Sequence, residues 1–141
     1  MKFNYCVWLI PRLKHSWSRY TNGFQPHLTI KSKLSKSDAA LLYTKLRLDK
    51  PLKVKLVGDL IYEVKDGFHS LYYLTEPVYK NKKPEWYPEN AHISFRYKYN
   101  ETFSKSEIKE VKNLIKEKEA ELTDFKLVYC NEHFLKWHYL E

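Results

Sequence analysis

Stretches rich in β-branched and aromatic residues alternate along this chain with two segments of helical periodicity. The stretches are bounded by proline, glycine and asparagine, which favour turns, so we interpret them as strands. They are Phe3–Ile10, Gln25–Ser32, Leu52–Val64, Gly67–Thr75, Ala91–Tyr99, Phe125–Cys130 and His133–Leu140. The adjacent residues Asp66 and Gly67 predict a tight hairpin turn between the third and the fourth strand.

The two helical segments are Lys36–Leu48 and Lys105–Leu122. In the second segment, Ile108, Val111 and Ile115 recur at helical spacing, and charged residues occupy the opposite side. The order of elements is strand–strand–helix–strand–strand, followed by strand–helix–strand–strand, so the two halves resemble each other. This order predicts a single α+β domain over residues 1–141 with an antiparallel sheet.

Each half of the chain contains one predicted strand with a histidine and a hydroxyl residue two positions apart. The first reads Pro-His-Leu-Thr-Ile around His27 and Thr29, and the second reads Ala-His-Ile-Ser-Phe around His92 and Ser94. Side chains alternate between the faces of a strand, so each histidine shares a face with its hydroxyl residue. Two such pairs suit metal-free cleavage of a phosphodiester. One imidazole would take a proton, the other would give one, and the hydroxyls would hold phosphate oxygens.

The similarity of the two strands continues beyond these pairs. The same alternation would place Lys31 and Arg96 on the faces of the two motifs. There they would stabilise charge on a phosphate, and we favour Arg96 because a guanidinium binds phosphate with two hydrogen bonds. A helix-start signal follows each strand: Ser35 and Ser104 are suited to cap a helix, and Ser104 with Glu107 forms a capping box. We therefore interpret each strand with its capped helix as one repeated unit.

The chain carries a formal net charge of +8 and has a pI of about 9.3, which favours anionic partners such as nucleotides, RNA or acidic membranes. The loops richest in cations and aromatic rings, Arg12–Phe24 and Val78–Asn90, each precede a motif strand. We expect them to frame the site, although ordinary polar loops with an aromatic ring packed beneath are the alternative. The candidate stacking rings are Trp17, Tyr20, Trp86 and Tyr87, and the candidate phosphate-attracting cations are Lys14, Arg19, Lys80, Lys82 and Lys83.

Other chemistries receive less support from the sequence. The three glycines of the chain exclude a glycine-rich phosphate loop, and no cysteine–histidine cluster has the spacing of a metal site, so we expect no metal and no cofactor. Cys6 and Cys130 lie in apolar strand-like stretches, where we expect buried free thiols in a reducing compartment. No apolar stretch approaches a membrane span and no signal peptide is visible, so we expect a cytoplasmic monomer without a membrane partner.

The paired motifs, each in a strand and one in each half of a small basic chain, resemble those of the 2H phosphoesterase superfamily. The resemblance implies a bilobal fold, with two pseudo-symmetric lobes of antiparallel sheet, helices packed outside and a central cleft. It also implies metal-independent chemistry, in which His27 and His92 serve as acid and base while Thr29 and Ser94 bind the scissile phosphate. Which histidine is the acid, and whether water or a ribose 2'-hydroxyl attacks, stays open at this point.

The leading hypothesis is a phosphodiesterase that cleaves 2'-5' or 3'-5' linked oligonucleotides, such as 2'-5' oligoadenylate, or cyclic di- or oligonucleotide second messengers. The short chain and its richness in Lys, Asn and Tyr fit a viral source, so we expect a role in immune evasion in the host cytoplasm. One alternative is a 2',3'-cyclic phosphodiesterase that processes RNA ends. Two others are a module that binds RNA or a nucleotide without turnover, and a basic structural protein whose repeats are accidental.

Overall fold

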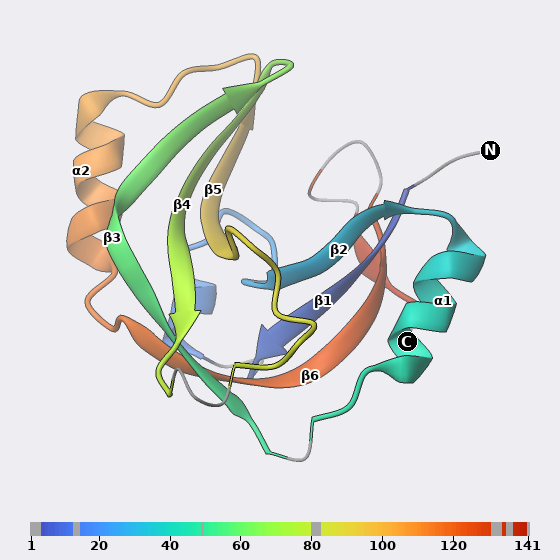
Figure 1. Ribbon diagram of the computed structural model, residues 1–141. Coiled ribbons are helices and arrows are strands. Elements are labelled where there is room, and N and C mark those ends of the chain that lie inside the picture. Colours follow the sequence, from blue (N-terminus) through green and yellow to red (C-terminus); the bar gives the residue numbers. More distant parts are fainter. Residues whose placement is uncertain are drawn as a thin grey trace.

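The computed structural model describes residues 4–12, 15–48, 50–79, 83–130, 134 and 137–140 (Figure 1). The elements follow the predicted order, and the α+β class with antiparallel pairing is confirmed. They are β1 (Tyr5–Pro11), the 3₁₀ turn η1 (Ser16–Arg19), β2 (Leu28–Leu34), α1 (Lys36–Lys45), β3 (Leu52–Lys65), β4 (Phe68–Pro77), β5 (His92–Tyr99), α2 (Lys105–Leu114), β6 (Glu119–Tyr129) and β7 (His138–Tyr139). Across the described ranges, no helix is both long and apolar enough to cross a membrane.

The strands form one sheet in the order β1-β2-β5-β4-β3-β6-β7. An additional pairing joins β1 to β6, so the first six strands of this order close into a ring. The β2 and β5 strands meet at a single pair of Cα partners, Leu28 and Ile93. This pair is one of two junctions between the N-terminal strands and the part built from β3, β4 and β5; the other is β6, which pairs with both β1 and β3.

The two faces of the sheet have different partners. In β1, Val7 and Leu9 point to the face that packs against both α-helices, because Val7 clusters with Ala39 of α1 and Leu9 belongs to the same core as Val111 of α2. Figure 1 shows α1 beside β1, β2 and β6, and α2 beside β3. Alternation along β1 then turns Trp8 to the opposite face, which neither helix covers.

Both predicted helix starts are confirmed. The Ser35 hydroxyl accepts a hydrogen bond from the Asp38 amide at the start of α1. At α2 the hydroxyl of Ser104 accepts from the amide of Glu107, and the Glu107 carboxylate accepts from the Ser104 amide, which completes the capping box. A bond to Lys98 and the Ser104 amide lower the Glu107 pKa to about 2.

The predicted end of the second helix is wrong. We expected a helix to Leu122, but α2 ends at Leu114 and the following residues enter β6. Ala120 and Leu122 pair with β3 and are buried, whereas the glutamates between and before them are exposed. The segment is rich in helix-forming residues, but burial of alternate side chains against the sheet outweighs that intrinsic preference.

The predicted free thiols are also wrong, because Cys6 and Cys130 form a disulfide. In the pairing of β1 with β6, Cys6 lies opposite Val128. Cys130 stands two residues beyond Val128 and therefore projects from the same face, next to Cys6. Within the predicted last strand, His133–Leu140, the described residues include β7 at His138–Tyr139, whereas His133, Leu135 and Lys136 fall outside the described residues.

Candidate active site

The pairing of Leu28 with Ile93 brings the two histidine motifs together at the centre of the sheet. These two residues are the middle positions of the motifs, and their strands run antiparallel. Each histidine therefore lies beside the hydroxyl residue of the other motif, on the face that the helices leave uncovered. The resulting group of four comprises His27, Thr29, His92 and Ser94.

Both histidines are held in the same way by the backbone. The Nδ1 of His27 lies 2.7 Å from the carbonyl oxygen of Gln25, and the Nδ1 of His92 lies 3.1 Å from that of Asn90, in each case two residues earlier. A carbonyl oxygen only accepts hydrogen bonds, so Nδ1 carries the proton in both rings. In a neutral ring, Nε2 then holds the lone pair that can accept a proton from a substrate or from water.

An aromatic ring from the adjacent strand lies against each histidine. Trp8 stacks on His27 with ring centroids 3.6 Å apart and planes 10° apart. Tyr72 is tilted against His92 with centroids 4.7 Å apart. In both cases the aromatic residue is the Cα partner of the hydroxyl residue in the same motif. The two half-sites therefore agree in sheet register as well as in sequence.

The predicted position of Lys31 on the motif face is wrong, because the strand register shifts directly after Thr29. Thr29 pairs with Trp8, whereas Lys31 pairs with Val7, so Ile30 is an extra residue in β2. Such a β-bulge reverses the alternation of side chains beyond it. Lys31 consequently follows the face of Val7, which contacts the helices, and its side chain is exposed there.

The same shift occurs in β5 directly after Ser94, where Phe95 is the extra residue. Phe95 is fully buried in the helix-side core, and the Nε of Arg96 donates a hydrogen bond to the carbonyl oxygen of Tyr20 at 2.8 Å. The expected alignment of Arg96 with the motif face is therefore wrong as well. Each bulge directly follows the hydroxyl residue of its motif, and each turns the next cation toward the helix side of the sheet.

Burial keeps His27 neutral. The side chain is 5% exposed, and desolvation lowers its pKa to about 4, with the positive charge of His92 acting in the same direction and the bond to Gln25 opposing it. His92, in contrast, is exposed to solvent. The two imidazoles therefore share a site and differ sharply in their surroundings, which is the condition for separate acid and base roles.

The two hydroxyl residues also differ in their exposure to solvent. Ser94 is 4% exposed, and its hydroxyl is a hydrogen-bond partner of the Tyr97 phenol. Burial raises the Tyr97 pKa to about 12, so this phenol stays protonated and can donate to the serine. Thr29 is half-buried on the same face. Of the two hydroxyl residues, Thr29 is the more open to solvent.

The structure does not bring the predicted aromatic loop residues to the histidines. Trp17 is fully buried and meets Phe95 edge-on in the helix-side core. Trp86 packs against Phe125, and Tyr87 is buried with its hydroxyl on Thr75. Of the predicted cations in these loops, Arg19 and Lys83 are exposed, while Lys14, Lys80 and Lys82 fall outside the described residues.

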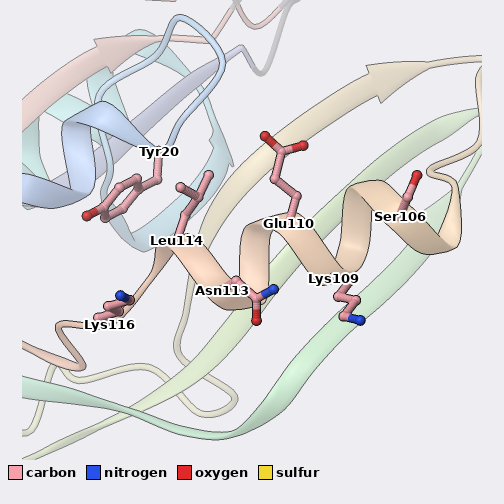
Figure 2. Close-up of a pocket in the computed structure, with 7 residues that line it drawn as sticks. All are labelled: Tyr20, Ser106, Lys109, Glu110, Asn113, Leu114 and Lys116. Atoms are coloured by element: carbon pink, nitrogen blue, oxygen red, sulfur yellow. The ribbon is translucent and has the colours of Figure 1, made fainter.

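Tyr20 lies on the helix side of the sheet, away from the motifs. Figure 2 shows its ring near Leu114 at the end of α2, where both residues line a surface pocket of about 590 Å³. The rings that do surround His27 are Trp8, Phe24 and Trp137. Sequence reasoning missed these three, because only the sheet register and the path of the C-terminal segment bring them to the histidine.

No protein-family model matches this chain, and no curated protein or solved structure matches it significantly. Among the described residues, no group of three or more His, Cys, Asp or Glu side chains is arranged to hold a metal ion. The chemistry of the site is therefore argued from its own residues.

Proposed function

We propose that this protein is a metal-independent phosphodiesterase of the 2H phosphoesterase type. The observation that carries the proposal is the Leu28–Ile93 pairing, which places two imidazoles and two hydroxyls beside one another on one face of the sheet. The repeated Nδ1 contacts, the aromatic partners and the matched bulges support a pseudo-twofold axis through this pair. The two halves related by this axis are the two lobes that we propose, with the phosphate bound between them.

The surroundings of the histidines support distinct roles. Neutral His27, with its proton fixed on Nδ1, offers Nε2 as the general base. It takes the proton from the attacking hydroxyl, either water or a ribose 2'-hydroxyl, as the new P–O bond forms. His92 is assigned the part of general acid, which gives a proton from Nε2 to the leaving oxygen as the old P–O bond breaks. Solvent then restores the two protonation states.

The hydroxyls and the charge of the site serve the phosphate. Thr29 and Ser94 donate hydrogen bonds to its non-bridging oxygens, which gain charge in the transition state. As the general acid, His92 lies next to these oxygens, whereas the bulges turn Lys31 and Arg96 toward the other face. The two cations contribute to the basic surface that attracts anionic substrates.

The proposed substrates are 2'-5' or 3'-5' linked oligonucleotides and cyclic nucleotide messengers, and the proposed role is viral immune evasion in the host cytoplasm. Processing of 2',3'-cyclic RNA ends uses the same acid and base and is the alternative. The net charge of +8 supports an anionic substrate of either kind.

One assay tests the activity and separates these substrates. The protein is incubated with excess EDTA and 2',3'-cyclic mononucleotides, 2'-5' oligoadenylate, 2'-5' and 3'-5' cyclic dinucleotides, or plain RNA, and products are resolved by chromatography. We expect turnover in EDTA and a loss of at least about a hundredfold in His27→Ala and in His92→Ala. The matched control is His15→Gln, at a histidine near Glu117 and Trp17 rather than at the motifs.

The outcomes distinguish the alternatives. Tight binding without any product would show that the protein is a nucleotide-binding module and not an enzyme. Activity abolished by EDTA would exclude the proposed mechanism. Equal activity of the histidine variants and the wild type would exclude the site itself.

A further inference from the structure

The Cys6–Cys130 disulfide lies on the motif face, in an apolar cluster that also contacts His27. The buried members of this cluster, each at most 3% exposed, are Cys6, Trp8, Ile10 and Val128. Cys130 and Trp137 pack against them. Cys6 and Trp8 stand two positions apart in β1, so their side chains project from the same face. The disulfide is therefore part of the packing around the candidate active site.

Two tryptophans connect the disulfide with the histidine. Trp8 stacks on His27 with ring centroids 3.6 Å apart, and Trp137 meets the same imidazole edge-on at 5.9 Å between centroids. The two indoles also meet each other edge-on, at 5.7 Å. One layer of rings thus separates the sulfur atoms from the proposed general base. A change in how the cluster packs therefore changes how these rings hold His27.

Reduction of the disulfide changes this packing, because two thiol groups occupy more room than two bonded sulfur atoms. Cys6 is almost fully buried, so the side chains around it have to accommodate the added volume. The backbone beside the bond is held by other contacts. The Cys130 amide donates to the carbonyl oxygen of Asn4 at 2.6 Å, and β1 pairs with β6 from Tyr5 to Pro11. We therefore expect the rings to shift while the strands stay paired.

Thiol–disulfide exchange can begin at Cys130, which is only partly buried. The thiolate of glutathione attacks the Sγ of Cys130 and forms a mixed disulfide, while Cys6 leaves as a thiolate and takes up a proton. A second glutathione thiolate then attacks the glutathione sulfur of the mixed disulfide, so that Cys130 leaves and is protonated in turn. The protein gains two electrons and two protons, and the two glutathione molecules become one molecule of oxidised glutathione.

We propose that this disulfide is a redox control of the candidate active site. The oxidised form holds Trp8 and Trp137 against His27, and reduction by a thiol such as glutathione loosens that contact. The inference rests on the proposed function, which places the protein in the cytoplasm, where disulfides are usually catalytic or redox-sensing rather than structural. The reduced form is the less active one, because displaced rings no longer orient the general base.

Two measurements compare oxidised wild type with wild type reduced by glutathione, after intact mass has verified each state. The first is NMR of the imidazole protons, in which the His27 resonances are assigned by their absence from His27→Phe. The stacked Trp8 ring shifts them upfield in the oxidised protein, and we expect them to move downfield on reduction. The second is kcat/KM for the best substrate of the phosphodiester panel, which we expect to fall about tenfold. The matched control combines Cys6→Ala with Cys130→Ala, and glutathione should change neither quantity in it.

The possible results separate the two proposals. Identical His27 resonances in both states, free thiols in the air-oxidised protein, or a response of the double variant to glutathione each refute the redox control, whatever the panel shows. Global unfolding on reduction, judged by circular dichroism, refutes it as well, because the bond is then only structural. If the resonances move and kcat/KM stays the same, control of the activity is refuted. If they move and neither state turns over any phosphodiester, the coupling of the disulfide to His27 stands and the enzyme proposal fails. The two states of wild type give these results even if the double variant does not fold.

Discussion

Protonation of His27 should couple the stability of this protein to pH. The folded-state pKa of His27 is about 4, whereas the ordinary value is 6.5. Because the folded pKa is the lower one, the unfolded chain binds the proton first as the pH falls. The free energy of unfolding is therefore at its full value above pH 6.5, decreases between pH 6.5 and pH 4, and has lost the whole contribution below pH 4.

The size of this effect follows from the same two pKa values. The difference corresponds to about 2 kcal/mol lost between pH 7 and pH 5, and about 3 kcal/mol by pH 4. We propose to measure it with His27→Phe, which keeps an aromatic ring against Trp8 and removes the titrating group. The variant also loses the bond to the Gln25 carbonyl, but that loss is the same at every pH. Urea unfolding at half-unit steps from pH 4 to pH 7 gives the two curves.

The difference between the two curves isolates His27, since the carboxylates titrate in both proteins. We expect wild type to lose about 3 kcal/mol more than His27→Phe over this range. Thr29→Val changes the same site and leaves the histidine in place. Its free energy of unfolding should therefore depend on pH in the same way as that of wild type. Parallel curves for wild type and His27→Phe would show that His27 is not held neutral by burial, and the assignment of the general base would fall with it.

Four further predictions use other features. The acid limb of kcat/KM should lie near pH 4, because His27 must be neutral to act as base; a limb at pH 6.5 contradicts this. Ser104→Ala should lower the free energy of unfolding by about 1 kcal/mol and more than Ser35→Ala, whose helix lacks the reciprocal capping bond; equal losses contradict the capping box. Reduction of the disulfide, which joins residues 124 positions apart, should cost about 2–5 kcal/mol in urea unfolding, and an unaltered midpoint would point to free thiols. Leu28→Ala, at a fully buried position, should cost about 2–5 kcal/mol and abolish activity; near-wild-type stability contradicts the central pairing.

Local sequence patterns predicted the parts of the fold that depend on near neighbours. The hairpin at Asp66 and Gly67 forms, and both residues have the positive φ values that such a turn needs. The capping serines begin their helices as expected. The same local reasoning wrongly extended the second helix to Leu122. Lys and Glu favour helices, and no pattern within the segment indicates that it pairs with β3 as a strand.

In the candidate site, too, sequence spacing predicted some features, whereas strand pairing decided others. Sequence spacing supplied the four motif residues, and the sheet brings them together. The extension to Lys31 and Arg96 failed because a bulge depends on how two strands fit, and alternation along one strand does not reveal it. For the loop rings the alternative of packing beneath the loops applies, because large aromatic rings gain from burial: Trp17 and Tyr87 are buried, and Trp86 is half-buried against Phe125.

The sequence by itself determined the order of the elements, the helix starts and the two histidine–hydroxyl pairs, since each depends on residues within a few positions of one another. Only the tertiary structure decided that the pairs meet at Leu28 and Ile93, that His27 is buried while His92 is exposed, and that Trp8 and Trp137 close around His27. Those properties depend on strand register and on solvent exclusion by segments far apart in the chain. The proton chemistry proposed for the site follows from them, because desolvation sets which imidazole stays neutral.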